Sequence, residues 1–125
     1  MNIVDSSGWL EYFADGPNAE FFASAIEKPD ELLVPSLSLY EVFKRVLQQR
    51  DEGDALRSVA FMQQGSVVDL DSRTALSAAK VSVDLGLPMA YSIMLATARQ
   101  HDATFWTQDA DFKGIEGVRY TEKEG

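Results

Sequence analysis

The chain of 125 residues is 46% apolar and 25% charged, a composition typical of one soluble globular domain with room for a real core. It contains no cysteine, which excludes disulfides, thiolate zinc sites and cysteine nucleophiles. Its formal net charge of −9 argues against sequence-independent nucleic-acid binding, which relies on Lys and Arg, and suits binding to metal ions or to a basic partner.

The first half of the chain alternates short apolar runs with helical patterns. In chain order we predict a strand at residues 2–5, helices at about 7–15 and 19–26, a strand at 32–34, a helix from 36 or 38 to 50, and a helix that follows Gly53 and ends at 64. In the third of these helices, apolar residues recur at i, i+3, i+4 and i+7, which indicates one buried face.

The second half continues this alternation. It predicts a strand at 67–68, a helix from 72 to 85 that Asp71 caps, a helix at 90–100, a strand at 104–106 and an edge strand at 118–120. The helix at 72–85 has an apolar face formed by Leu76, Ala79 and Val83. The helix at 90–100 is apolar on nearly every side, so we expect it to be buried.

Strands that alternate with helices imply an α/β sandwich whose sheet is parallel and whose crossovers are right-handed. We expect a single domain over residues 1–125, with a polar tail at 121–125 that frays. The N-terminus has no basic stretch before an apolar one, and no apolar run is long enough to cross a bilayer. These features predict a cytoplasmic chain that does not contact a membrane.

Acidic residues lie where the predicted strands end and helices begin. Asp5 follows the first strand, and Glu41 lies early in a helix. Asp109 and Asp111 follow the strand at 104–106. In an α/β domain these points meet at the carboxyl edge of the sheet, where active sites form. Carboxylates gathered there repel one another, and the usual remedy is a hard divalent cation such as Mg²⁺ or Mn²⁺.

Each of these acids also has an ordinary structural interpretation. The alternatives are a helix cap for Asp5, a capping box for Ser38 and Glu41, and a turn for Asp109 and Asp111. The hydroxyls of Thr107, Ser6 and Ser7 can hydrogen-bond the carboxylates, or they can serve turns and caps.

Four segments stand in order along the chain. They are Val4-Asp5-Ser6-Ser7; Ser38-Leu39-Tyr40-Glu41-Val42; Leu87-Pro88-Met89-Ala90 followed by Ser92-Ile93-Met94-Leu95-Ala96-Thr97-Ala98; and Thr107-Gln108-Asp109-Ala110-Asp111-Phe112. Together, at fitting spacings, they resemble the four motifs of the PIN domain family, and within it those of the VapC-type toxins of toxin–antitoxin pairs. The resemblance runs from the first predicted strand to the last.

The resemblance implies a PIN-like three-layer α/β/α sandwich around a parallel sheet of four to five strands. It implies a metal-dependent endoribonuclease, a toxin that hydrolyses phosphodiester bonds of RNA with Mg²⁺ or Mn²⁺. The implied catalytic residues and metal ligands are Asp5, Glu41 and Asp109, with Asp111 as a further ligand. It also implies a homodimer, and an antitoxin protein that binds a groove formed by the early helices.

One position departs from the family pattern. Tyr91 stands where the third motif normally carries Asp, and a neutral phenol with a pKa of roughly 10 cannot replace the charge of a carboxylate. Tyr91 is therefore a substituted ligand position, and it predicts impaired activity. Two accounts stay open. The chain is a naturally degenerate member, or it is an inactivated form of an active toxin, because one base change converts an Asp codon to a Tyr codon.

Two other classes of function compete with the nuclease. The first is a weak or inactive PIN-fold binding module that still pairs with an antitoxin. The second is a phosphatase or phosphoacceptor domain, but Ser7 stands where a phosphatase needs its second Asp, and Lys113 does not fit the phosphoacceptor pattern. The single histidine, His101, has no second His or Cys near it in the sequence, so it makes no zinc site.

An acidic nuclease must still admit a polyanion such as RNA. The candidate sources of local positive charge are Lys44, Arg45, Arg50, Arg57, Arg73 and Arg99. An antitoxin could use the acidity of the site by placing an Arg among the carboxylates.

Overall fold

A computed structural model describes residues 1–124, so that Gly125, the end of the tail predicted to fray, lies outside the described residues. At its centre is a five-stranded sheet in the order β3-β2-β1-β4-β5, in which every neighbouring pair is parallel. The strands are β1 (Asn2–Val4), β2 (Leu32–Pro35), β3 (Ser66–Val68), β4 (Thr104–Thr107) and β5 (Val118–Tyr120). All five predicted strands are confirmed, and β5 is an edge strand as expected.

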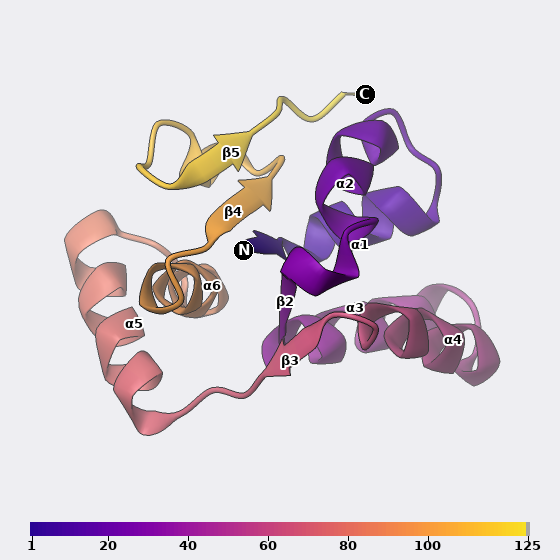
Figure 1. Cartoon of the computed structure of the whole chain (residues 1–125), viewed down its shortest axis with the longest axis horizontal. Coiled ribbons are helices and arrows are strands. Elements are labelled where there is room, and N and C mark those ends of the chain that lie inside the picture. The colour runs from indigo at the N-terminus through magenta and orange to yellow at the C-terminus, as the bar shows by residue number, and fades with distance from the viewer. Residues whose placement is uncertain (125) are drawn as a thin grey trace.

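Helices cover both faces of this sheet (Figure 1). They are α1 (Ser6–Phe13), α2 (Ala19–Ile26), α3 (Ser36–Gln49), α4 (Glu52–Met62), α5 (Ser72–Leu85) and α6 (Met89–Gln100), with two short 3₁₀ helices, η1 (Pro29–Glu31) and η2 (Ala110–Phe112). Figure 1 shows α5 and α6 on one side of the sheet and α1 to α4 on the other. The expected three-layer α/β/α sandwich is confirmed.

The sheet separates two apolar cores. One lies beneath α5 and α6 and includes Ile3 and Phe105, and the other lies beneath α1 to α4 and includes Val4 and Trp106. Because successive side chains of a strand point to opposite faces, β1 and β4 each contribute to both cores. This explains why each strand carries two consecutive apolar residues, Ile3-Val4 and Phe105-Trp106, rather than an alternating pattern.

The register of the two central strands fixes what lies at their carboxyl ends. Val4, the last residue of β1, pairs with Trp106 in β4, and the Asp5 N–H donates to the Trp106 carbonyl at 2.9 Å. Asp5 and Thr107 therefore leave the sheet side by side at its carboxyl edge.

Gly8 allows α1 to lie close against this part of the molecule. A Cβ atom at this position would be 2.6 Å from Phe22 Cε1 and 2.8 Å from Val4 Cγ1, which are distances that packed atoms do not reach. Because α1 begins directly after Asp5, this close approach fixes the point at which the Asp5 side chain leaves β1.

Helices α5 and α6 differ in how well their sequence predicts their burial. Helix α6 is buried along most of its length, as its apolar sequence predicted. The buried residues of α5 are Thr74, Ala78 and Val81. In contrast, Leu76 is 75% exposed and Val83 is 83% exposed, so the predicted apolar face of α5 is wrong: that face is turned to solvent.

Among the described residues no single helix is long and apolar enough to cross a membrane. Taken together, α5 and α6 reach the required length and apolar composition, but the pair is bent by 116°.

Asp51, rather than Gly53, marks the start of α4. The Asp51 side chain accepts a hydrogen bond from the Asp54 N–H at 2.8 Å, which places Gly53 inside the first turn and corrects the predicted boundary. Asp71 caps α5 in the same way, by accepting from the Thr74 N–H at 2.8 Å, as predicted. In both α4 and α5, the acidic residue at the N-cap therefore marks where the helix begins.

Candidate functional site

Asp5 is the first residue after β1 and is only 5% exposed. It occupies the position before α1, but its side chain makes no capping hydrogen bond, so the helix-cap interpretation is wrong. Instead, Oδ2 accepts a hydrogen bond from the Thr107 hydroxyl at 2.8 Å, and the Ser7 hydroxyl lies 3.5 Å from the same oxygen. The carboxylate is therefore directed across the edge of the sheet toward β4.

Glu41 reaches the same edge from α3, where it is half-buried. Its Oε1 accepts a hydrogen bond from the Ser6 hydroxyl at 2.7 Å, which joins α3 to the start of α1. The alternative interpretation, a capping box, is wrong, because α3 begins before Ser38 and the Ser38 hydroxyl lies against the Met94 sulfur at 3.6 Å. The Glu41 side chain is therefore used across the site and not at its own helix end.

Asp109 lies in the turn after β4, and both of its carboxylate oxygens accept hydrogen bonds. Oδ1 accepts from the Asp111 backbone N–H at 2.9 Å, so the turn interpretation is confirmed for Asp109. Oδ2 accepts from the phenol hydroxyl of Tyr91. The Asp111 side chain itself is exposed, which makes it a weaker candidate for a ligand.

Thr107 joins the two acids that flank it in space. Its buried hydroxyl donates to Asp5 and accepts from the Asp109 N–H at 3.0 Å. Together with the bond from Ser6 to Glu41, these contacts bring the three predicted acids to one edge of the sheet. The hydrogen bonds expected of the Ser6 and Thr107 hydroxyls are present.

Tyr91 stands on α6 and faces these acids. Its ring is half-buried and packs against Phe112, with the ring centroids 5.1 Å apart. The hydrogen bond to Asp109 is the main cause that raises the pKa of the Tyr91 hydroxyl above its ordinary value, and burial and the charges of Asp109, Asp5 and Asp111 raise it further. A neutral phenol therefore lies among the carboxylates.

The site concentrates negative charge. Burial raises the pKa of the Asp5 carboxyl from 3.8 to about 6, and the charges of Glu41 and Asp109 add to this effect, whereas the hydrogen bond from Thr107 opposes it. The ion pairs of residues 1–124 lie on α5 and around the start of α4, so none of these acids has a basic partner there. A cation would stabilise a buried carboxylate in such surroundings.

The side chains fit a hard divalent cation by chemistry but are not assembled as a full set of ligands. Carboxylate and hydroxyl oxygens are the donors that Mg²⁺ and Mn²⁺ prefer. In the part of the chain that the structure describes, however, no group of three or more His, Cys, Asp or Glu is close enough to hold an ion. Asp109 is hydrogen-bonded to Tyr91, at the position where the motif predicts a further acid.

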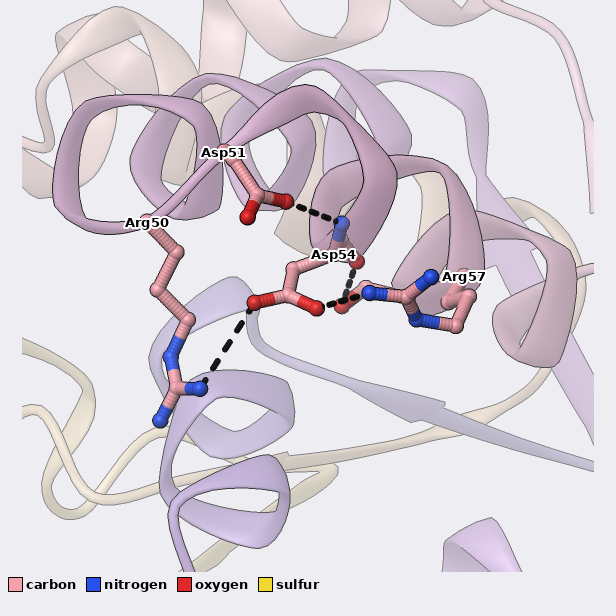
Figure 2. Close-up of polar contacts among 5 residues, drawn as sticks. Arg50, Asp51, Asp54 and Arg57 are labelled. Carbon is pink, nitrogen blue, oxygen red and sulfur yellow. Dashed lines mark hydrogen bonds and ion pairs between the residues drawn. The ribbon is translucent and has the colours of Figure 1, made fainter.

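Two of the basic residues predicted to serve a polyanion are instead held by an acid. Figure 2 shows Arg50 and Arg57 directed at opposite oxygens of Asp54. Arg50 Nη1 lies 3.6 Å from Asp54 Oδ2, and the hydrogen bond from Arg57 is the main cause that lowers the pKa of Asp54. A third candidate, Lys44, lies 5.7 Å from the centroid of the Tyr40 ring. The Asp54 carboxylate therefore offsets part of the positive charge where α3 ends and α4 begins.

Asn18 and Gln108 form a buried polar pair beside the site that the sequence analysis did not single out. Asn18 Nδ2 donates to Gln108 Oε1 at 2.9 Å and to the Glu122 carbonyl at 3.0 Å. In addition, the Thr121 N–H donates to the Thr107 carbonyl at 3.1 Å. These bonds hold the segment after β5 against the site. The only signal in the sequence was the place of Gln108 between two site residues.

Comparison with known proteins gives a consistent result. The sequence model of the PIN domain family matches residues 3–118. No curated protein sequence matches the chain.

Several solved structures share the fold. A toxin–antitoxin complex from Klebsiella pneumoniae superposes with a TM-score of 0.82 at 19% identity, over 95% of this chain and 96% of that chain. VapBC2 from Rickettsia felis, bound to a DNA fragment from its promoter, gives 0.74 at 12% identity over 97% of each chain. VapC20 from Mycobacterium tuberculosis, a toxin that cleaves the sarcin–ricin loop, gives 0.75 at 14% identity over 93% of this chain and 95% of that chain. At these identities the likeness establishes the fold.

Proposed function

The chain belongs to the PIN domain family, and on this premise we propose that it is the toxin of a toxin–antitoxin pair, a metal-dependent endoribonuclease whose activity Tyr91 impairs. The observation that carries this proposal is the buried Asp5 carboxylate, which lies at the carboxyl edge of the sheet with Glu41 and Asp109 as acidic neighbours. Solved relatives that are toxin–antitoxin complexes support the pairing with an antitoxin.

Asp5 would be the central ligand of the cation, and Glu41 and Asp109 would complete the acidic set. When bound, Mg²⁺ or Mn²⁺ lowers the pKa of a water molecule and stabilises the charge that develops on the phosphate. The chain positions two of these acids through hydroxyls, because Thr107 fixes the Asp5 carboxylate and Ser6 fixes Glu41.

Open hollows on either side of α1 support a protein partner. One, of about 340 Å³, lies between α1 and the α3–α4 pair, where Leu10, Phe13 and Val46 lie beside Arg50 and Arg57. The other, of about 660 Å³, lies between α1 and α2. Asp54 also lines the first hollow and pairs with both arginines, so an antitoxin segment that carries apolar side chains would complement it.

The remaining parts of the proposal concern substrate, assembly and compartment. RNA is the proposed substrate, and the cytoplasm is the proposed compartment. A homodimer is proposed as well, and the exposed apolar stripe of α5, which includes Leu76 and Val83, supports association with a second copy.

A second candidate function is a PIN-fold module that binds an antitoxin without cleaving RNA. The observation that favours it is the hydrogen bond between Tyr91 and Asp109, together with the absence of a three-acid group among residues 1–124. A module of this kind should show no specific Mn²⁺ binding that depends on Asp5.

The experiment that tests the proposed function is an RNA-cleavage assay with Mg²⁺ or Mn²⁺. Replacing Tyr91 with Asp restores a carboxylate to the site, and we expect cleavage to rise by about 10–100-fold, an effect typical of changes in and around a metal site. Cleavage should stop when EDTA removes the cation.

Two further variants control this assay. Asp5→Asn, made in the Tyr91→Asp chain, should abolish cleavage, because it removes the central ligand. Asp30→Asn makes the same chemical change at an exposed acid on η1, and it should leave cleavage unchanged. If the unchanged chain, the Tyr91→Asp chain and the double variant with Asp5→Asn all cleave RNA equally well, then Asp5 and its acidic neighbours are not the catalytic centre.

A further inference from the structure

We propose that the Tyr91 hydroxyl stands in the place of the cation beside Asp109, so that Tyr91 is a positioning residue that holds this centre closed. The inference rests on the proposed function and deepens it, because it concerns how cation binding at the same site is controlled. A cation then enters by displacing a hydrogen bond and not by filling an open cage.

The Asp109 carboxylate provides the first observation. One oxygen accepts the Asp111 N–H at 2.9 Å and the other accepts the Tyr91 hydroxyl. A cation that uses the second oxygen must compete with the phenol proton for it. Hydrogen bonds to ionised carboxylates are among the stronger ones in proteins, so this competition weakens cation binding.

The position of the phenol beside two of the acids is the second observation. The Thr107 hydroxyl donates to Asp5 and accepts from the Asp109 N–H, so the carboxylate that the Tyr91 hydroxyl binds lies next to that of Asp5. Within the described residues Asp5 and Asp109 are not part of any group of three acids that could hold an ion. Both facts are expected if a neutral donor lies beside Asp109 and occupies one acceptor site of its carboxylate.

The Tyr91 ring is held in this position by packing. It contacts Phe112, which is completely buried and packs in turn on Phe105 with ring centroids 4.9 Å apart. Tyr91 also belongs to α6, whose later turns are buried. The hydroxyl therefore cannot leave Asp109 by a free rotation of an exposed side chain.

Loss of the hydroxyl alone tests the inference. Tyr91→Phe keeps the ring and its contact with Phe112, adds no carboxylate and frees one oxygen of Asp109. We expect this variant to bind Mn²⁺ about tenfold more tightly than the unchanged chain in calorimetric titration at pH 7.5, the effect of removing one charge-assisted hydrogen bond. If the phenol oxygen instead served as a ligand, the same change would weaken binding. Unchanged or weaker binding overturns the inference, and so does a failure of both chains to bind.

Tyr12→Phe is the matched control. Its hydroxyl also donates to a carboxylate, that of Glu27 at 2.8 Å, but this pair is exposed. The control should leave Mn²⁺ affinity unchanged, which separates a local effect at Asp109 from a general effect of removing a tyrosine hydroxyl.

A second measurement follows the phenol directly. The chain has four tyrosines, so incorporation of 3-fluorotyrosine should give four ¹⁹F resonances, and the one absent from Tyr91→Phe belongs to Tyr91. Titration with Mg²⁺ should shift this resonance and leave that of Tyr12 in place. A Tyr91 resonance that stays unchanged while Mg²⁺ binds contradicts the displacement of its hydrogen bond.

Asp5→Asn distinguishes failure of this inference from failure of the proposed centre. If it abolishes Mn²⁺ binding in both the unchanged chain and Tyr91→Phe, the centre is located at Asp5, and the inference depends only on the effect of the hydroxyl. If Mn²⁺ binds equally well without Asp5, the proposed centre itself is wrong, and the inference falls with it.

Discussion

Asp5 combines burial with a lack of compensating charge. Its carboxylate accepts a hydrogen bond from Thr107, but it has no basic partner in the described part of the chain, and two acids lie near it. A charged group in such a place destabilises the folded state, and either a proton or a cation relieves that destabilisation. A bound cation would therefore favour the folded state of a chain that carries Asp5 in this position.

This position predicts how stability depends on pH when no cation is present. The pKa of folded Asp5, about 6, lies above its ordinary value of 3.8, so the folded state binds the proton more tightly than the unfolded state. The stabilisation is complete below about pH 4 and is lost as the pH rises through 6, a change of about 3 kcal/mol at 1.36 kcal/mol per pH unit. Asp5→Asn lacks this titration. In urea unfolding with EDTA, the variant should therefore gain stability relative to the unchanged chain between pH 4 and pH 7.5.

Saturating Mn²⁺ provides the control for that measurement. At pH 7.5 it should stabilise the unchanged chain and not Asp5→Asn, which narrows the difference between them. A difference in unfolding free energy that is the same at pH 4 and pH 7.5 would show that Asp5 is not the buried titrating group.

At the scale of helices and strands, the sequence predicts well where each element begins and ends, and less well which side of a helix is buried. Strand ends could be placed because apolar runs stop at polar residues, and in a parallel sheet such ends converge, which is why Asp5 and Asp109 were expected to meet. The buried side of α5 could not be read in the same way. Its periodicity marks an apolar stripe, but whether Leu76 or Ala78 faces the core depends on how closely α5 approaches α6.

The same limit applies to the site. The motif spacing predicted that Glu41 and Asp109 belong to it. For Glu41 the local sequence also allowed a capping box with Ser38, which does not form because the helix begins two residues earlier. The hydrogen bond from Tyr91 to Asp109 depends on side-chain rotamers on two separate elements. No spacing in the sequence encodes such a contact.

The close approach of α1 to the sheet leads to a prediction at this scale. Gly8→Ala adds a Cβ atom 2.6 Å from Phe22 Cε1, and we expect a loss of about 1–3 kcal/mol in unfolding free energy despite the better helix propensity of Ala. Gly53→Ala is the matched control. It lies in α4, where the nearest atom to the new Cβ is 3.4 Å away, and it should stabilise the chain slightly. Thermal unfolding of both variants measures this, and a stabilised Gly8→Ala would contradict the packing described for α1.

At the scale of the whole molecule, charge and apolar surface are distributed unevenly. The chain carries a net charge of −9, and the Arg50 and Arg57 side chains are directed at Asp54 (Figure 2). Apolar side chains remain exposed along α5, on the face opposite the early helices. Attraction to a polyanion such as RNA must therefore come from a few basic side chains or from a cation bound at the acidic site. Association with another protein can use the exposed apolar surface of α5.

The exposed stripe of α5 gives a prediction about assembly. If two copies associate through it, Val83→Lys places a charge in the interface and should weaken the dimer by about tenfold or more. Leu56→Lys alters a similarly apolar residue, 52% exposed on α4, and should leave the dimer intact. Light scattering after size exclusion distinguishes the two, and equal masses for both variants would place the contact elsewhere.

The polar pair of Asn18 and Gln108 has a practical consequence for work on this chain. Asn18 ties the Glu122 carbonyl to Gln108, the residue before Asp109, so a tag added after residue 125 begins three residues beyond a segment that lies next to the acidic site. A polyhistidine tag attached there would bring its own imidazoles to any divalent ion under study. A tag ahead of Met1, whose carbonyl accepts the Thr104 N–H at the far rim of the sheet, avoids that artefact.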